Sequence, residues 1–515
     1  MLCYNITLFQ SALQDLLKTM HYNSKMYSYN DFLEDTIDKY ELPHLWNKAI
    51  QRQLNEIQKN QKRKSVPKSN NPFVTIDGDD AKDFDDAVYC KKIKNGFLLE
   101  VAIANPAAYI EKNSALDQEA LKRGTSVYFP GLVIPMLPEL LSNELCSLNP
   151  NNPKLTIVCS MKFDNQGKNA SYDFMEREII SQKRLTYNEV NHFIGGSTGR
   201  LSKDIKSSLL ALQELASKRL LLKKQRGALS INSSEIEIKL DANKLPIKIN
   251  KRSTGAAEKM IEEAMIAANI SAALFLEGHN RKLLYRVHEE PQEDKLKTSQ
   301  EILQTKDLNK LPTAQFINAM AERYANNALS SLLILQTLPR ATYEIENKGH
   351  FGLGLKNYAH FTSPIRRYPD LILHRLILSI IRNDRYPYKD EELKLIADLS
   401  SKNEKNADQA MRNLQQKLVC KYLEKKNGEI FKGVISGLSD FGAFVILDDY
   451  FSSGLIHISN IGNGRYIFDA KKIIMRNKKN GHTLKVGMLV EVKILNVIPM
   501  EGKIDLKLVR INAKK

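Results

Sequence analysis

An acidic segment at residues 75–87 constrains the fold of this chain most strongly, because six aspartates fall within ten positions. The six are Asp77, Asp79, Asp80, Asp83, Asp85 and Asp86. The flanking runs, residues 72–76 and 87–90, are β-branched, aromatic or apolar, and Asn95-Gly96 leads into another apolar run. This order predicts a strand, an acidic loop and then a β-hairpin.

Carboxylates at this density repel one another. The fold can accommodate the loop if cations lie among the carboxylates and reduce that repulsion. Mg²⁺ takes few oxygen ligands from protein, since water and phosphate complete its shell. An acidic run can also be a solvated loop. Here, however, strand-like segments enclose it, and the chain is basic overall, with a formal net charge of +17. A calcium loop of the EF-hand type does not fit, because Lys82 stands where that loop needs Gly.

The basic charge indicates a polyanionic partner, most simply nucleic acid, although a lysine-rich composition bias would give the same sign. Five scattered cysteines in 515 residues suit a reducing compartment, so we expect a cytoplasmic protein. No apolar run approaches the ~20 residues that span a bilayer, and the first residues lack a basic secretory-signal start. We therefore expect no membrane association, and we expect a monomer.

The pattern of apolar and polar residues divides the chain into three parts. Residues 1–70 read as a helical N-terminal region that ends in a basic linker, to which we assign no function. Residues 71–424 begin with strands and continue with amphipathic helices from about Tyr187 onward, which predicts an α+β domain. Residues 428–510 alternate apolar and polar positions with glycine punctuation, and five short strands there predict a small OB-fold β-barrel.

A second polar motif, Thr362-Ser-Pro-Ile-Arg-Arg-Tyr368, precedes an apolar helix. Such a turn presents hydroxyls, backbone N–H groups and a guanidinium near a helix N-terminus, which suits a phosphate group. An ordinary capped helix with solvated arginines is the alternative. Together with the acidic loop, the motif favours metal-assisted phosphoryl chemistry, in which arginine balances charge that develops on phosphate.

Several spaced motifs resemble the ribonuclease II / ribonuclease R family of exoribonucleases. They are Asp77-x5-Asp83-x-Asp85-Asp86, Tyr128-Phe-Pro-Gly131, Arg226-Gly-Ala228, Ile261-Glu-Glu263 and the Thr362–Tyr368 motif, in the order of that family. The resemblance covers roughly residues 71–420. Residues 428–510 are similar to the S1-type RNA-binding domain of the family, on the strength of Gly442-Ala-Phe-Val445 and Gly454-Leu-Ile-His-Ile-Ser459.

The resemblance implies Mg²⁺-dependent hydrolysis of single-stranded RNA from the 3′ end to nucleoside 5′-monophosphates, with two cations. It implies metal binding by Asp77, Asp83 and Asp86, and catalytic roles for Asp85 and for Arg366, which would hold the scissile phosphate. It implies RNA contacts by Tyr128, Tyr187, Glu262, Arg367, Phe441 and His457. Core packing is the alternative for Tyr128. In the barrel, alternation places one of Phe441 and Phe444 in the core, and we expect Phe441 and His457 to be exposed.

The sequence departs from the family pattern in three places. Ile231 stands where the family has a stacking Phe, and Asn105 stands where it usually has Asp. The two N-terminal cold-shock barrels of the family have no counterpart in the first 70 residues. A catalytically weak RNA-binding or regulatory protein on the same fold is therefore an alternative, and a metal-dependent phosphodiesterase for another substrate is a second one. The four aspartates and Arg366 argue against the first, and the barrel argues against the second.

Overall fold

The computed structural model describes residues 27–59, 66–197, 200–230, 236–251, 254–303, 311–323, 334, 336–450, 452–470 and 473–512. A six-stranded sheet in the order β7-β6-β3-β2-β1-β8 forms its centre. The strands are β1 (Val74–Asp77), β2 (Asp86–Ile93), β3 (Gly96–Ala104), β6 (Pro153–Phe163), β7 (Asn169–Ile180) and β8 (Lys183–Thr186). Neighbours are antiparallel except β1 and β8.

The acidic loop joins β1 to β2, and the Asn95-Gly96 turn joins β2 to β3, as the sequence predicts. Gly96 has a φ of 140°, and a Cβ there would lie 1.9 Å from the Phe163 carbonyl oxygen, so the turn needs glycine. The α+β class is confirmed by the helices that cover this sheet, α5 (Tyr187–Ile194), α6 (Lys203–Gln225), α7 (Ala256–Gly278) and α11 (Tyr368–Ile381).

Residues 127–134 form a two-stranded hairpin of β4 (Val127–Phe129) and β5 (Leu132–Ile134), which we did not predict. Strands of three residues are too short to show a period of two. The hairpin follows α4 (Ala115–Arg123) and packs with α2 (Tyr29–Lys39) and α12 (Asp390–Leu423) in one apolar cluster. Helix α3 (Lys48–Lys59) lies against α4.

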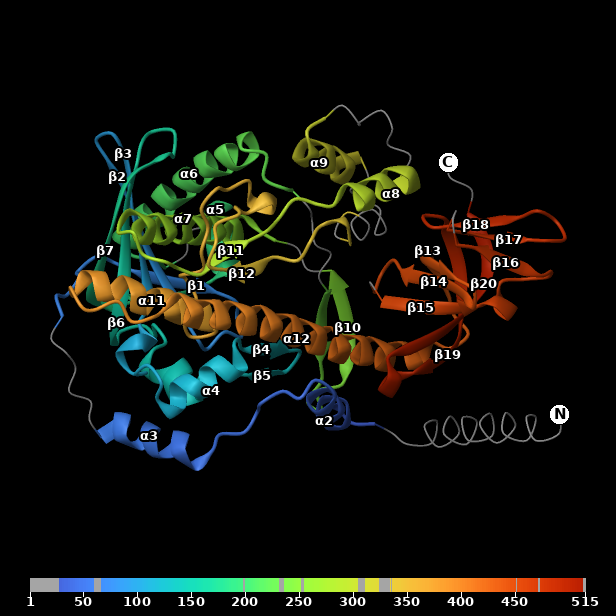
Figure 1. Ribbon diagram of the computed structural model, residues 1–515, viewed down its shortest axis with the longest axis horizontal. Helices are drawn as coiled ribbons and strands as arrows, with labels where there is room; N and C mark the ends of the chain where they lie inside the picture. The colour runs from blue at the N-terminus through green and yellow to red at the C-terminus, as the bar shows by residue number, and fades with distance from the viewer. Residues whose placement is uncertain are drawn as a thin grey trace.

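The barrel is confirmed: β13 (Ile430–Ser439), β14 (Gly442–Leu447), β15 (Ser452–His457), β20 (Lys503–Asn512) and β19 (Leu489–Ile498) close on themselves. A three-stranded sheet that we did not predict, β16 (Tyr466–Asp469), β17 (Ile474–Asn477) and β18 (Thr483–Lys485), lies between β15 and β19 in the chain. In Figure 1, α12 runs from the central domain to the barrel as one long helix.

Further α-helices and strands lie outside the central sheet and the barrel. They are β9 (Ile236–Leu240), β10 (Pro246–Lys251), β11 (Tyr285–Val287), α8 (Glu293–Leu303), α9 (Thr313–Arg323) and β12 (Thr342–Glu344). Among the helices of the described ranges, none combines the length and the apolar character needed to cross a membrane.

Candidate functional site

Four aspartates converge at the junction of β1 and β2. Asp77 is the last residue of β1, Asp86 is the first of β2, and Asp83 and Asp85 lie in the loop between them. Asp85 is buried, whereas Asp79 and Asp80 at the loop's tip are exposed. The antiparallel pairing of β1 with β2 therefore separates the six aspartates of the sequence into an inner set and an outer pair.

Two side chains from outside the acidic segment hold this loop in place. Ser147 Oγ accepts the Phe84 N–H at 2.9 Å and donates to the Lys82 carbonyl at 2.9 Å. Arg184, on β8, donates to the carbonyls of Gly78 and Asp79 at 3.2 and 2.5 Å. Both side chains bind backbone atoms of the loop and leave its carboxylates available for other partners.

Charge within the inner set is poorly compensated by the protein. Burial raises the pKa of Asp77, and burial raises the pKa of Asp85 well above the ordinary range of a carboxyl. Burial, together with the charge of Asp77, raises the pKa of Asp86 to about 7. The guanidinium of Arg366 opposes all three shifts without cancelling them. The site therefore favours added positive charge.

Arg366 and Asp85 face each other across the site. The Ile365 N–H donates to Asp85 Oδ1 at 2.9 Å, and Arg366 Nε lies 3.4 Å from Asp85 Oδ2. Arg366 also donates to Ser363 Oγ at 2.9 Å, yet its side chain stays 44% exposed. The arginine is thus fixed at one edge while its remaining N–H groups are open to a phosphate.

Arg367 has a different environment from its neighbour. Its guanidinium donates to Asp370 Oδ1 at 2.7 Å, and the same oxygen accepts the Ser363 N–H at 2.8 Å. Asp370 is fully buried. The pair holds the turn together from inside, and the contact of Arg367 with RNA stays a prediction.

The backbone of Arg366 is clamped by the segment just before β4. Its carbonyl accepts the Ser126 N–H at 3.0 Å and the Thr125 hydroxyl at 3.0 Å. Tyr368 N–H donates to the Gly124 carbonyl at 2.9 Å. Sequence reasoning missed this clamp, because most of its hydrogen bonds join backbone atoms, which leave no trace in the choice of side chains.

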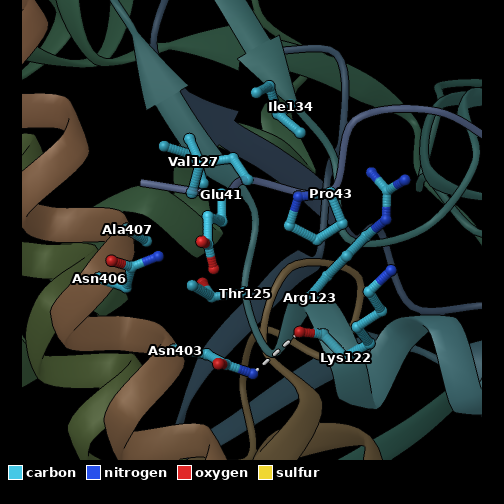
Figure 2. Close-up of a pocket in the computed structure, with 11 residues that line it drawn as sticks. Glu41, Pro43, Lys122, Arg123, Thr125, Val127, Ile134, Asn403, Asn406 and Ala407 are labelled. Carbon is cyan, nitrogen blue, oxygen red and sulfur yellow. Dashed lines mark hydrogen bonds between the residues drawn. The ribbon is translucent and has the colours of Figure 1, made fainter. Parts of the chain in front are cut away.

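Thr125 also lines a small cavity of about 120 Å³ (Figure 2). Helices α4 and α12, the β4–β5 hairpin and the segment after α2 enclose it, and Asn403 donates to the Lys122 carbonyl at 3.0 Å at its edge. None of the aspartates lines this cavity. It belongs to the packing behind the clamp, not to the acidic site.

The two tyrosines of the prediction lie at the acidic site. Tyr128, on β4, is 41% exposed, and its hydroxyl donates to Asp83 Oδ2 at 2.5 Å. Tyr187, the first residue of α5, is half-buried; burial raises the pKa of its hydroxyl, and the charges of Asp77 and Asp86 raise it further. Core packing is thereby excluded for Tyr128.

Glu262, on α7, is exposed and accepts Lys223 Nζ at 2.6 Å. Its carboxylate pairs with Lys223 and not with a residue of the inner set, and its role at the terminal nucleotides stays a prediction. On the barrel, Phe441 is 46% exposed, His457 is exposed and Phe444 is half-buried. The expectation that Phe441 and His457 are exposed is confirmed. The expectation that alternation buries one phenylalanine was wrong, because Phe441 lies in the turn before β14, outside the pleat.

The departure at Asn105 has a local explanation. Asn105 is fully buried, and its amide donates to Glu176 Oε1 at 3.4 Å, a carboxylate that also pairs with Arg382. An aspartate there would set two carboxylates side by side. Ile231 lies outside the described residues.

The oxygen atoms that the acidic site offers as ligands decide whether a cation fits there. Carboxylate oxygens are the ligands that Mg²⁺ prefers. Asp85 Oδ2 is buried and accepts no hydrogen bond. Within the described ranges, no three acidic, histidine or cysteine side chains already stand close enough to enclose a metal ion. The residues therefore fit a cation that takes only a few of them, with water and phosphate supplying its other ligands.

Comparison with known proteins agrees with this geometry. Residues 63–383 match the RNB domain and residues 424–508 match the S1 RNA binding domain. Ribonuclease R of Escherichia coli K12 is 39% identical over 498 residues, which cover 91% of this chain. The chain spans only 61% of that relative's length.

Solved structures share the fold. RNase R of Mycoplasma genitalium, solved in complex with ribose-methylated single-stranded RNA, superposes with a TM-score of 0.87 at 32% identity, covering 93% of this chain and 77% of that one. Yeast Ssd1, a pseudonuclease, shares the fold with a TM-score of 0.65 at 19% identity, covering 81% of this chain and 53% of its own. The RNB match spans more than half of the chain, and this chain belongs to the RNB-domain family that includes ribonuclease R.

Proposed function

We propose that this protein is a Mg²⁺-dependent exoribonuclease that hydrolyses single-stranded RNA from the 3′ end and releases nucleoside 5′-monophosphates. The observation that carries the proposal is the buried Asp85 facing Arg366 within a set of under-compensated aspartates. Burying carboxylates with too few partners costs free energy of folding, and an apolar core would stabilise the fold better. The aspartates are therefore better explained by binding than by stability.

The residues divide the chemistry between them. Asp77, Asp83 and Asp86 would hold the cations, and Asp85 would orient the attacking water. Bound Mg²⁺ would supply the charge that makes water a nucleophile and stabilises the leaving oxygen. Arg366, anchored to Ser363 and Asp85 and otherwise exposed, would hold the scissile phosphate and balance its developing charge.

The RNA strand would be held by aromatic rings and by the barrel. Base stacking on an aromatic ring contributes roughly 1–3 kcal/mol per base and accepts any base. Tyr128 and Tyr187 offer rings beside the aspartates, and Phe441 with His457 offers a second contact on the barrel. Glu262 would accept a hydrogen bond from a ribose 2′-hydroxyl, which distinguishes RNA from DNA.

The alternative is a protein that binds RNA without cutting it, and one assay separates the two. Single-stranded RNA labelled at its 5′ end is incubated with the protein and Mg²⁺, and the products are sized over time. We expect progressive shortening of the labelled strand, mononucleotide 5′-phosphates in the unlabelled fraction, and no cleavage in EDTA or of a DNA strand of the same sequence.

Asp85→Asn serves as the matched variant, because it keeps the shape of the side chain and an oxygen for the Ile365 N–H. We expect it to bind RNA as wild type does and to lose turnover by on the order of 10²-fold or more. RNA binding by wild type with an intact labelled strand would favour the alternative.

A further inference from the structure

The hydroxyl of Tyr128 has a contact that base stacking does not explain. Stacking uses the ring, and a phenylalanine would serve as well. In the structure, the hydroxyl instead donates to Asp83 Oδ2 at 2.5 Å. One side chain thus joins an exposed aromatic face to one of the aspartates that would hold a cation.

The bond engages only one oxygen of Asp83. Oδ2 accepts from Tyr128, which leaves Oδ1 for another partner. A carboxylate that accepts a hydrogen bond on one oxygen has its rotation fixed, and the direction of its second oxygen is fixed with it. Outer hydrogen bonds of this kind orient metal ligands, and losing one typically costs ~10–100-fold in metal affinity or activity.

The support of Tyr128 is rigid enough for this role. Its neighbours on β4, Val127 and Phe129, are buried in the cluster formed with α2 and α12. At the turn of the hairpin, the buried hydroxyl of Tyr29 on α2 donates to the Pro130 carbonyl at 2.7 Å. The hairpin is therefore anchored on both sides of Tyr128, and the hydroxyl has a defined position relative to Asp83.

We propose that Tyr128 is a positioning residue for the cation site: its hydroxyl orients Asp83, while its ring receives a base. The inference rests on the proposed function. It implies that a base seated on the ring and a cation held by Asp83 stabilise the same position of the tyrosine. A properly seated strand then tightens cation binding, and a bound cation favours a seated strand, because such coupling is reciprocal.

The test compares Tyr128→Phe, which keeps the ring, with Tyr128→Ala, which removes both groups. Tyr386→Phe is the matched control, since that hydroxyl donates to the Lys282 carbonyl away from the aspartates. Calorimetric titration with Mg²⁺ or Mn²⁺ in the absence of RNA measures the cation site. Fluorescence anisotropy of a labelled short oligoribonucleotide in EDTA measures the ring, and turnover is measured across Mg²⁺ concentrations.

We expect Tyr128→Phe to bind the oligomer in EDTA as wild type does, but to bind the cation ~10–100-fold more weakly and to recover turnover at high Mg²⁺. Tyr128→Ala should lose both affinities, and Tyr386→Phe should lose neither. A cation affinity of Tyr128→Phe equal to or tighter than that of wild type would overturn the inference. So would an equal loss of oligomer binding in Tyr128→Phe and Tyr128→Ala. Absence of cleavage by wild type would reject the proposed function instead, because the cation titration does not depend on cleavage.

Discussion

Replacing Asp86 by Asn should stabilise the metal-free protein while it abolishes the chemistry. The pKa of Asp86 is about 7 in the folded protein, against an ordinary 3.8. A raised pKa means that folding favours the neutral carboxyl. The associated stability is complete below the unfolded pKa and is lost as the pH rises through the folded pKa.

The size of the effect follows from the shift. About three pKa units correspond to about 4 kcal/mol at pH values above 7, and partial exposure of the side chain reduces this to about 2–4 kcal/mol. Asp86→Asn carries no charge at any pH and escapes this cost. Its advantage over wild type should be near zero at about pH 3, and should grow steadily to its full size at about pH 8.

Urea unfolding in EDTA at several pH values measures the difference in the free energy of unfolding between the two proteins. Asp80→Asn is the control, because Asp80 belongs to the same loop but is exposed, and surface changes of this kind stay within about 0.5 kcal/mol. Added Mg²⁺ should stabilise wild type more than Asp86→Asn, since a ligand stabilises the form that binds it. A difference that does not change with pH, or a less stable variant at about pH 8, would refute the reasoning.

Two further predictions concern the barrel and the N-terminal helix. Phe441→Ala should weaken the affinity for single-stranded RNA by about 1–3 kcal/mol without changing its dependence on salt, because no charge is removed; Val509→Ala, exposed elsewhere on the barrel, is the control. A salt dependence that changes with Phe441→Ala would mean that the ring does not act by stacking. Tyr29→Phe should lower the free energy of unfolding by about 1–3 kcal/mol, because the Pro130 carbonyl loses its donor, and should weaken binding of short oligomers in EDTA. Oligomer affinity that stays at the wild-type value would show that the hairpin does not need α2.

The sequence allowed the strongly patterned parts of the structure to be predicted. Asn95-Gly96 and its flanking apolar runs define the β2–β3 hairpin, and glycine punctuation with alternation defines the barrel. The inner aspartates could be selected from the six only through the family resemblance. Periodicity does not distinguish the buried Asp85 from the exposed Asp79; the pairing of β1 with β2 makes that distinction.

What could not be predicted depends on contacts between segments far apart in the chain. Residues 124–126 bind Arg366 and Tyr368 mostly through main-chain atoms, which every residue type shares. The bond from Tyr128 to Asp83 joins two segments that are 45 residues apart in the chain. The strands of the sheet β16–β18 have only four, four and three residues, which is too short for alternation to identify them.

Helix α12 sets the spacing and the orientation between the acidic site and the barrel. It has 34 residues, which at 1.5 Å per residue gives a rod of about 51 Å, and it touches α2, α4 and β4 before it reaches β19 and β20. Adding one residue to its distal half would turn the barrel by about 100° and carry Phe441 away from the strand's path. Adding seven would restore the angle to within about 20° and move the barrel outward by about 10 Å. Under the proposed function, the residue count of α12 therefore sets both the length of RNA between the two contact points and the angle at which the barrel meets it.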